Sequence, residues 1–248
     1  MEVHAHTHTP RKKWIHYFWE FFMLFLAVTL GFFVENWREH YIERKKEKEY
    51  IHSMLSDLSA DTANFHRKIS KVNDAVRQLD TLIRLLNKSS GDSTQQQRLY
   101  YLARISSRII EFFYINNTTY EQMKSSGNLR ILKNYEIARG IANYYNNVHY
   151  MNIQNDILVN RQTVLIEAIK KVFNQAVFQE MLDIHSTATS YPRGNPLLIT
   201  EDKYLKNELV GSIHYFSTVG SVNANNALAV GEQADRLISF LKNEYHLK

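Results

Sequence analysis

The sequence contains no cysteine and is poor in glycine and proline, with 8 and 3 respectively among 248 residues. The absence of cysteine excludes disulfides, thiolate zinc sites and a cysteine nucleophile, and it is compatible with a reducing or an oxidising compartment. Two of the prolines, Pro192 and Pro196, lie in one short stretch. Long spans are therefore free of helix-stopping residues, which favours an all-α fold.

The common sequence signatures of catalysis are also missing. The chain has no HExxH zinc motif, no glycine-rich phosphate-binding loop and no GxSxG nucleophile elbow. Carboxylate pairs such as Asp57 with Asp61 are expected to be solvated on helix surfaces. We therefore expect neither an enzyme nor a bound cofactor.

Charge of one sign is not concentrated anywhere in the chain. Lysine and arginine number 30 against 25 acidic residues, and the net charge of +5 is spread along the sequence. No tract resembles a nucleic-acid-binding arm, so nucleic acid is not expected as a partner. The mean hydropathy of −0.38 is that of a soluble protein, so a membrane segment would have to be local.

Residues 14–34 form such a segment. The stretch WIHYFWEFFMLFLAVTLGFFV holds one carboxylate and no lysine or arginine, and its length matches the roughly 20 residues that cross a bilayer as a helix. Trp14 and Trp19 at one end and Trp37 at the other would lie at the two lipid–water interfaces. No small-residue cleavage site follows, so we expect a retained transmembrane helix that contacts the lipid bilayer.

Glu20 is the most informative residue of this anchor, because an ionised side chain is costly inside a bilayer. Helical spacing places it on one face with the residues His16, Leu24, Ala27 and Gly31. This face combines a polar pair with small residues that permit close approach of a second helix. We expect it to pack against another helix; the alternatives are that Glu20 extends toward the headgroups, or that His16 and Glu20 carry a proton or ion.

The residues before the anchor, 1–13, are expected to form a flexible histidine-rich tail. His4, His6 and His8 are weak candidates for a metal site, because a flexible tail lacks the fixed geometry of a dedicated one. Basic residues lie on both sides of the anchor. We expect the amino terminus to be cytoplasmic and the rest of the chain periplasmic.

Beyond the anchor, the sequence predicts a charged helical stalk over residues 35–50 and a helical bundle over 51–248. From Ile51 to Leu86, apolar residues recur at alternating steps of four and three, as in a coiled coil. A second helix is expected to extend through Phe112 and Phe113. The pattern as a whole predicts about four long helices in an elongated antiparallel bundle, one of them broken near residues 116–117.

Later segments fit the same pattern. Residues 118–127 predict a short helix that Gly127 ends. A long helix is expected from about Asn134, with Asn155 and Gln162 as polar interruptions that either fix register or face a wet gap. An irregular stretch should cover 186–200, followed by a last helix over about 201–245.

Two blocks, MEVHAHTHTPRKKWIHYFWEFFMLFLAVTLGFFVENWREH (1–40) and TYEQMKSSGNLRILKN (119–134), resemble an uncharacterised bacterial family of small proteins with one amino-terminal membrane helix. Together they cover about a fifth of the chain. The resemblance implies this architecture and a bacterial membrane, and it implies no activity. We therefore expect a single-pass protein of the bacterial inner membrane.

The leading functional hypothesis is a non-enzymatic assembly or scaffold protein. It would form a homo-oligomer or bind another membrane protein through its anchor face and its heptad helix. The alternative is a ligand-sensing or transport accessory protein that uses a cleft of the bundle or the His16–Glu20 pair.

Overall fold

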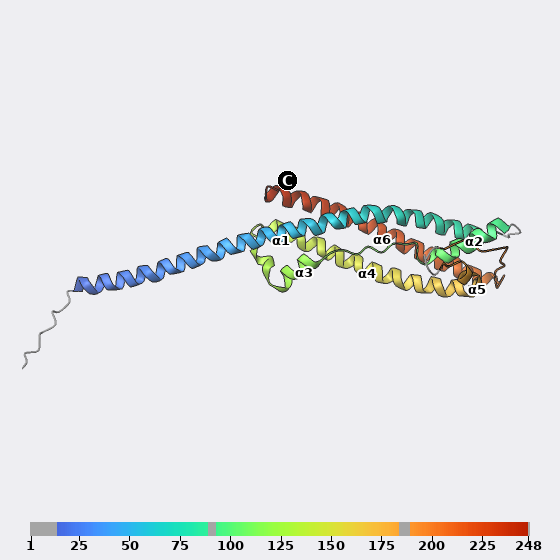
Figure 1. Cartoon of the computed structure of the whole chain (residues 1–248), viewed down its shortest axis with the longest axis horizontal. Coiled ribbons are helices and arrows are strands. Elements are labelled where there is room, and N and C mark those ends of the chain that lie inside the picture. Colours follow the sequence, from blue (N-terminus) through green and yellow to red (C-terminus); the bar gives the residue numbers. More distant parts are fainter. Residues whose placement is uncertain (1–13, 89–92, 184–188, 248) are drawn as a thin grey trace, which may run out of the picture. The chain divides into compact units, whose positions relative to one another are not determined.

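The computed structural model describes residues 14–88, 93–183 and 189–247, and these are almost entirely helical (Figure 1). The elements are α1 (Trp14–Leu86), α2 (Ser93–Ser106), α3 (Thr118–Ser125), the 3-10 turn η1 (Asn128–Ile131), α4 (Tyr135–Val172), α5 (Gln175–Glu180) and α6 (Lys203–Glu244). Within the described ranges, β-structure is limited to one isolated bridge between Leu182 and Thr189. The all-α prediction is confirmed. The tail with His4, His6 and His8 lies outside the described residues.

The chain divides into two units, Met1–Tyr50 and Ile51–Lys248. In the first unit, α1 is long and apolar enough to cross a membrane by length and composition, and no residue of its most apolar window is buried. The side chains of the predicted stalk are mostly exposed. Glu47 departs from the expected solvated stalk, because only 6% of its surface is exposed.

In the second unit, α1 presents the predicted apolar seam. Ile51, Leu58, Phe65 and Leu79 are each at most 1% exposed, and their spacing in multiples of seven keeps them on one side of the helix. The seam predicted from the heptad pattern is therefore the side of α1 that enters the core.

α4 and α6 pack side by side (Figure 1). Asn147 near the middle of α4 donates to Gln233 at 2.7 Å, and Lys171 at its end pairs with Glu208 at 2.8 Å. The earlier of these two α4 residues therefore contacts the later α6 residue, and the later α4 residue contacts the earlier one. Both helices begin as the sequence indicates: Asn134 caps α4, and Asp202 caps α6 by accepting bonds from two backbone N–H groups.

The second predicted helix is wrong over its last third. α2 ends at Ser106, and residues 107–117, which we call the strap, are non-helical. The strap contains neither glycine nor proline, so no local breaker marks it. Its conformation is fixed instead by side chains of α1 and α4, described below.

The strap also fits closely against α6. Ile110 is buried, and a Cβ atom placed on Gly220 would lie 2.5 Å from its Cδ1 atom and 3.1 Å from its Cγ2 atom. The glycine therefore leaves the space that the isoleucine fills. Short helix α5 was not expected from the sequence; Asn174 caps it.

We predict that Gly220→Val destabilises the protein by about 1–3 kcal/mol, because it overfills this contact. Gly211→Val is the matched control, since no atom lies within 4 Å of its Cβ position. Urea unfolding of the full chain in mild detergent measures both. Combining Gly220→Val with Ile110→Ala should cost less than the sum of the two single changes, and strictly additive losses would show that the two residues do not compete for space.

Candidate functional site

The predicted anchor face is formed by α1 as expected. His16 Nε2 lies 3.3 Å from Glu20 Oε1, one helical turn away, and both side chains are 52% exposed. Leu24 is 67% exposed, and nothing lies within 4 Å of the Cβ position of Gly31. Ala27 is exposed as well. In a single chain this face is therefore open along its whole length.

The three tryptophans flank this face at the ends of the apolar segment. Trp14, Trp19 and Trp37 are 81%, 55% and 75% exposed. Trp14 stacks on Phe18, and Phe18 meets Trp19 edge to face, each at 6.4 Å between ring centroids. Their amphipathic rings are suited to the lipid–water interface.

The composition of the anchor face is suited to contact with a second helix. A carboxyl in an apolar segment gains from a polar neighbour, and His16 already supplies one on the same helix. About two turns after Glu20, Ala27 and Gly31 follow at a spacing of four, which allows two helix backbones to approach closely. The alternative, in which His16 and Glu20 carry a proton, also requires the two side chains to lie within hydrogen-bonding distance, and their separation of 3.3 Å is compatible with both uses.

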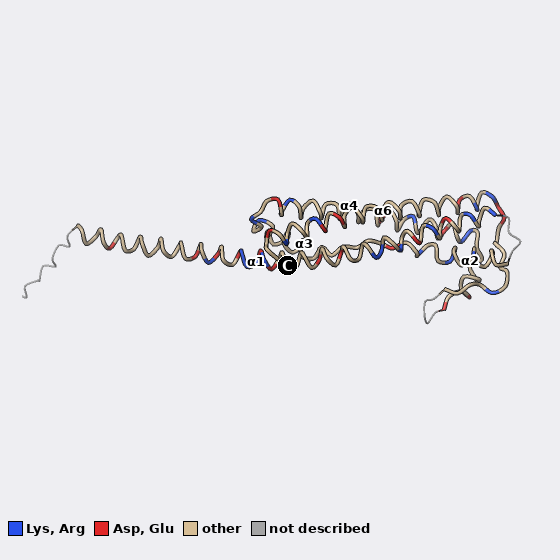
Figure 2. The backbone as a smooth tube through the Cα atoms, turned by 90° about the horizontal axis from the view of Figure 1, so that it is seen from above, with Lys and Arg blue, Asp and Glu red and all other residues tan. Residues whose placement is uncertain are grey.

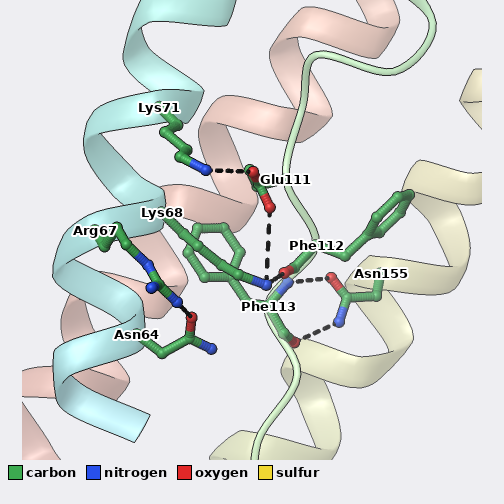
Figure 3. A network of polar contacts seen from close by, with 8 residues as sticks. All are labelled: Asn64, Arg67, Lys68, Lys71, Glu111, Phe112, Phe113 and Asn155. Carbon is green, nitrogen blue, oxygen red and sulfur yellow. Dashed lines mark hydrogen bonds and ion pairs between the residues drawn. The ribbon is translucent and has the colours of Figure 1, made fainter. Parts of the chain in front are cut away.

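A second polar cluster surrounds the strap (Figure 3). On the α4 side, Asn155 donates to the carbonyl of Phe113 at 2.7 Å and accepts from its N–H at 3.4 Å, while Gln162 donates to the carbonyl of Ser107. Asn155 thus pairs with Phe113 as a neighbouring β-strand would. It also accepts a bond from Asn223 of α6 at 2.9 Å.

On the α1 side, other strap residues find their partners. Lys68 donates to the carbonyl of Phe112 at 2.5 Å, and Lys71 pairs with Glu111 at 3.0 Å. Asp61 accepts from the N–H of Asn116 at 3.1 Å. Backbone groups of residues 107 and 113 therefore bond to α4, and those of residues 112 and 116 bond to α1.

The carboxylates of Asp57 and Asp61 anchor the end of the strap. Asp57 accepts from Asn116 Nδ2 at 2.7 Å and from Thr119 Oγ1 at 2.5 Å, and Asp61 also accepts from the Tyr144 hydroxyl at 3.3 Å. Only 4% of Asp61 is exposed. The expectation that this pair is solvated is therefore wrong for Asp61, because the strap and α4 cover it.

Burial sets the protonation behaviour of this cluster. It raises the pKa of the Asp61 carboxyl from 3.8 to about 6, against the opposing effect of the bonds from Asn116 and Tyr144; the nearby charge of Asp57 adds to the rise. Burial likewise raises the pKa of the Tyr144 hydroxyl, and the charge of Asp61 adds to it. The cluster holds the strap in place.

A hollow of about 600 Å³ lies in the second unit where the end of α1, α2 and the start of α6 meet. Its lining combines apolar residues such as Leu85 and Leu99 with Lys88, Lys203 and the ion pair of Lys206 with Glu201. Among the described residues, no three histidine or acidic side chains are grouped so as to hold a metal ion. The tail histidines are outside the described ranges.

The sequence pointed to some of these residues but not to their roles. Asn155 and Gln162 stood out as polar positions in an apolar seam, and the structure shows that they fix the strap and do not face a wet gap. Asp61 and Lys68 gave no such signal, because charged residues are ordinary on a long helix. Their partners are more than 40 residues away in sequence.

Comparison with protein families, with curated proteins and with solved structures finds no match to this chain. Membership in the bacterial family that residues 1–40 and 119–134 resemble therefore stays a prediction.

Asn155→Leu should destabilise the protein by about 3 kcal/mol, because it leaves both backbone groups of Phe113 and the amide of Asn223 without their buried partner. Asn160→Leu, at an exposed position of the same helix, should change the free energy of unfolding by less than about 0.5 kcal/mol. Denaturant unfolding compares them. Equal effects of the two substitutions would contradict the role of Asn155.

Asp61→Asn should change the pH dependence of stability. Because the folded-state pKa of Asp61, about 6, lies above its ordinary value of 3.8, Asp61 adds stability that is complete below pH 3.8 and lost as the pH rises through 6. Relative to the wild type, the variant should therefore gain about 2 kcal/mol between pH 4.5 and 7.5. Unfolding at both pH values tests this; parallel stability curves would contradict it.

Proposed function

We propose that this chain is a non-enzymatic, single-pass protein of the bacterial inner membrane that assembles through its anchor helix. One observation carries the proposal. The face of His16, Glu20, Leu24, Ala27 and Gly31 places a polar pair and two small residues in line on an apolar helix, and all of it is open in the single chain.

The physical argument concerns the carboxyl of Glu20. In a bilayer, the half-exposed His16–Glu20 pair faces lipid unless another helix covers it, and lipid offers no hydrogen bonds. A second copy of the same helix would bring the same polar pair and the same small residues to the contact. Self-association is therefore the simplest way to cover the face, and the anchor of another membrane protein is the other occupant.

The remaining parts of the proposal follow from the same architecture. The tryptophans at both ends of residues 14–34 support a transmembrane placement. We propose that the amino terminus is cytoplasmic and that the second unit is periplasmic. The second unit would be an elongated antiparallel bundle of about four helices, a scaffold that the anchor helices bring together, and the resemblance of residues 1–40 and 119–134 supports a bacterial source.

A ligand-sensing role is the second candidate. The hollow near Leu99 and Lys206 favours it, because apolar and charged side chains meet there. Binding in this hollow would not require the anchors to associate. The experiment on Glu20 therefore separates the two candidates.

We expect Glu20→Leu to weaken assembly while leaving membrane insertion intact. Loss of a polar contact between membrane helices costs about 0.6–2 kcal/mol, which corresponds to roughly a 3- to 30-fold weaker association. Light scattering of the full chain in mild detergent, over a dilution series, measures the native mass. Phe22→Leu is the matched control, because it removes a large side chain on the opposite side of the helix.

Two outcomes would contradict self-assembly through the anchor. If Glu20→Leu kept the assembly state and heat resistance of the wild type, the face would have no packing role. If the wild-type chain were a monomer at all concentrations, the anchor would await a different protein, and crosslinking in intact membranes would be the next step.

A further inference from the structure

The stalk of α1 is rich in charge of both signs (Figure 2). Its charges are sorted along the helix: Glu35, Glu39 and Glu43 follow one another at steps of four, and Arg44 and Lys48 are also four residues apart. Like charges at this spacing are neighbours on the helix surface and destabilise a lone helix. Alternation of the two signs at steps of four would suit a solvated helix better, so the sorted order calls for another explanation.

The anchor face continues into the stalk, because α1 is one helix from Trp14 to Leu86. Steps of seven from Gly31, the last residue of the anchor face, lead to Arg38 and Lys45. Residues seven apart lie on nearly the same side of a helix. We call the line through Gly31, Arg38 and Lys45 the facing line, since anchors that pack through their faces would bring these lines together.

The two signs of charge lie on opposite sides of the facing line, as the rotation of about 100° per residue shows. On one side, the acidic flank consists of Glu35, Glu39, Glu43 and Lys46. On the other side, the basic flank has no acidic residue and consists of Tyr41, Arg44 and Lys48. All these residues are exposed, whereas the buried Glu47 lies at the rear of the helix.

Ion pairs within the helix use only part of this charge. They are Glu35 with Arg38, Glu43 with His40 at 3.4 Å, and Glu49 with Lys45 at 4.0 Å. In the part of the stalk that the structure describes, Glu39 of the acidic flank and both Arg44 and Lys48 of the basic flank take part in no ion pair. Each flank therefore offers charge to a partner outside the helix.

We propose that two copies of this chain also associate through their stalks, with the acidic flank of each against the basic flank of the other. The inference rests on the proposed function, because the anchors bring the two stalks together as parallel helices. Parallel helices that meet along equivalent lines bring opposite flanks together, as the e and g positions of a parallel coiled coil do. Both seams of the pair then join opposite charges, whereas an antiparallel pair would join like charges.

Anionic lipid headgroups fit the basic flank less well than a second copy does. With Trp37 at the lipid–water interface, Arg44 and Lys48 lie about 10 and 17 Å further along the helix axis. Arg38 is the residue next to Trp37, and it already pairs with Glu35. Lipid would also leave the acidic flank without a partner, whereas a second copy matches both flanks at once.

Because the chain has no cysteine, a single cysteine reports on this contact in the full chain in bacterial membranes. Ile42→Cys lies beside the facing line, where the side chain is 39% exposed. Treatment with a short bis-maleimide crosslinker should give a covalent dimer with twice the mass of the chain. His40→Cys, at an exposed position on the rear of the same helix, is the control and should remain monomeric.

Reversal of the charge of one flank should weaken the contact. Added to Ile42→Cys, the pair Arg44→Glu and Lys48→Glu gives an acidic chain, and the pair Glu39→Lys and Glu43→Lys gives a basic chain. Each chain alone places like charges on both seams, which should lower the yield of dimer about tenfold, as several exposed ion pairs acting together would.

The matched control reverses two charges elsewhere on α1. Arg67→Glu with Arg77→Glu, both at exposed positions, changes the net charge by as much as Arg44→Glu with Lys48→Glu does. This control should leave the yield of dimer unchanged. Far-ultraviolet circular dichroism of each purified chain shows whether the helices remain.

The acidic and basic chains should pair with each other. They are coexpressed, and one is lengthened by a carboxy-terminal tag so that the three possible dimers differ in mass. Both seams of the mixed dimer join opposite charges, so it should be the main product. Damage to the helix by the substitutions would not restore pairing, and a random mixture of the three dimers would contradict the stalk contact.

The outcomes separate this inference from the anchor proposal. If reversal of either flank leaves the dimer unchanged while Glu20→Leu weakens assembly, the stalk contact is wrong and the anchor proposal stands. If the acidic and basic chains pair only with each other while Glu20→Leu leaves assembly unchanged, the stalk contact stands and the packing role of Glu20 is wrong. Failure of Ile42→Cys to crosslink, or adducts with the mass of a different protein, would overturn a second copy as the partner of the stalk.

Discussion

A non-helical backbone segment inside a helical protein must find hydrogen bonds outside itself, and the second unit is organised around that requirement. The strap, residues 107–117, has few backbone bonds of its own. Its backbone groups form hydrogen bonds with Asn155 and Gln162 of α4 and with Lys68 and Asp61 of α1. Since an unpaired buried polar group costs roughly 1–3 kcal/mol, these few side chains determine where the strap can lie.

The packing of the helices follows from the position of the strap. The ring of Phe113 meets that of Phe65 on α1 at 6.0 Å, and Ile110 fills the space left by Gly220 on α6. The strap therefore joins α1 to the closely packed pair of α4 and α6. Burial of Asp61 is a consequence, because its carboxyl must lie where the strap needs an acceptor, and the raised pKa reflects that position.

The anchor helix also carries polar groups that need hydrogen-bond partners, but its proposed surroundings are lipid and not a protein core. In the second unit, polar groups of the strap are paired with groups far away in the same chain. In the anchor, the His16–Glu20 pair lies on an open face of a lone helix, where only another chain or the membrane interface can cover it. The proposed function places a second chain where the single chain leaves this face open.

The local sequence was sufficient to predict the features that depend only on neighbouring residues along a helix. The apolar run 14–34, the seam from Ile51 to Leu86, the stop at Gly127 and the starts of α4 and α6 are set by short-range sterics and helical periodicity, and the structure confirms them. The strap was different. Its residues carry a helical apolar pattern and no breaker, and only bonds to side chains more than 40 positions away make the non-helical form stable. The tertiary structure therefore decided the end of α2, the burial of Asp61 and the role of Asn155, because each depends on groups that the sequence separates and the fold brings together.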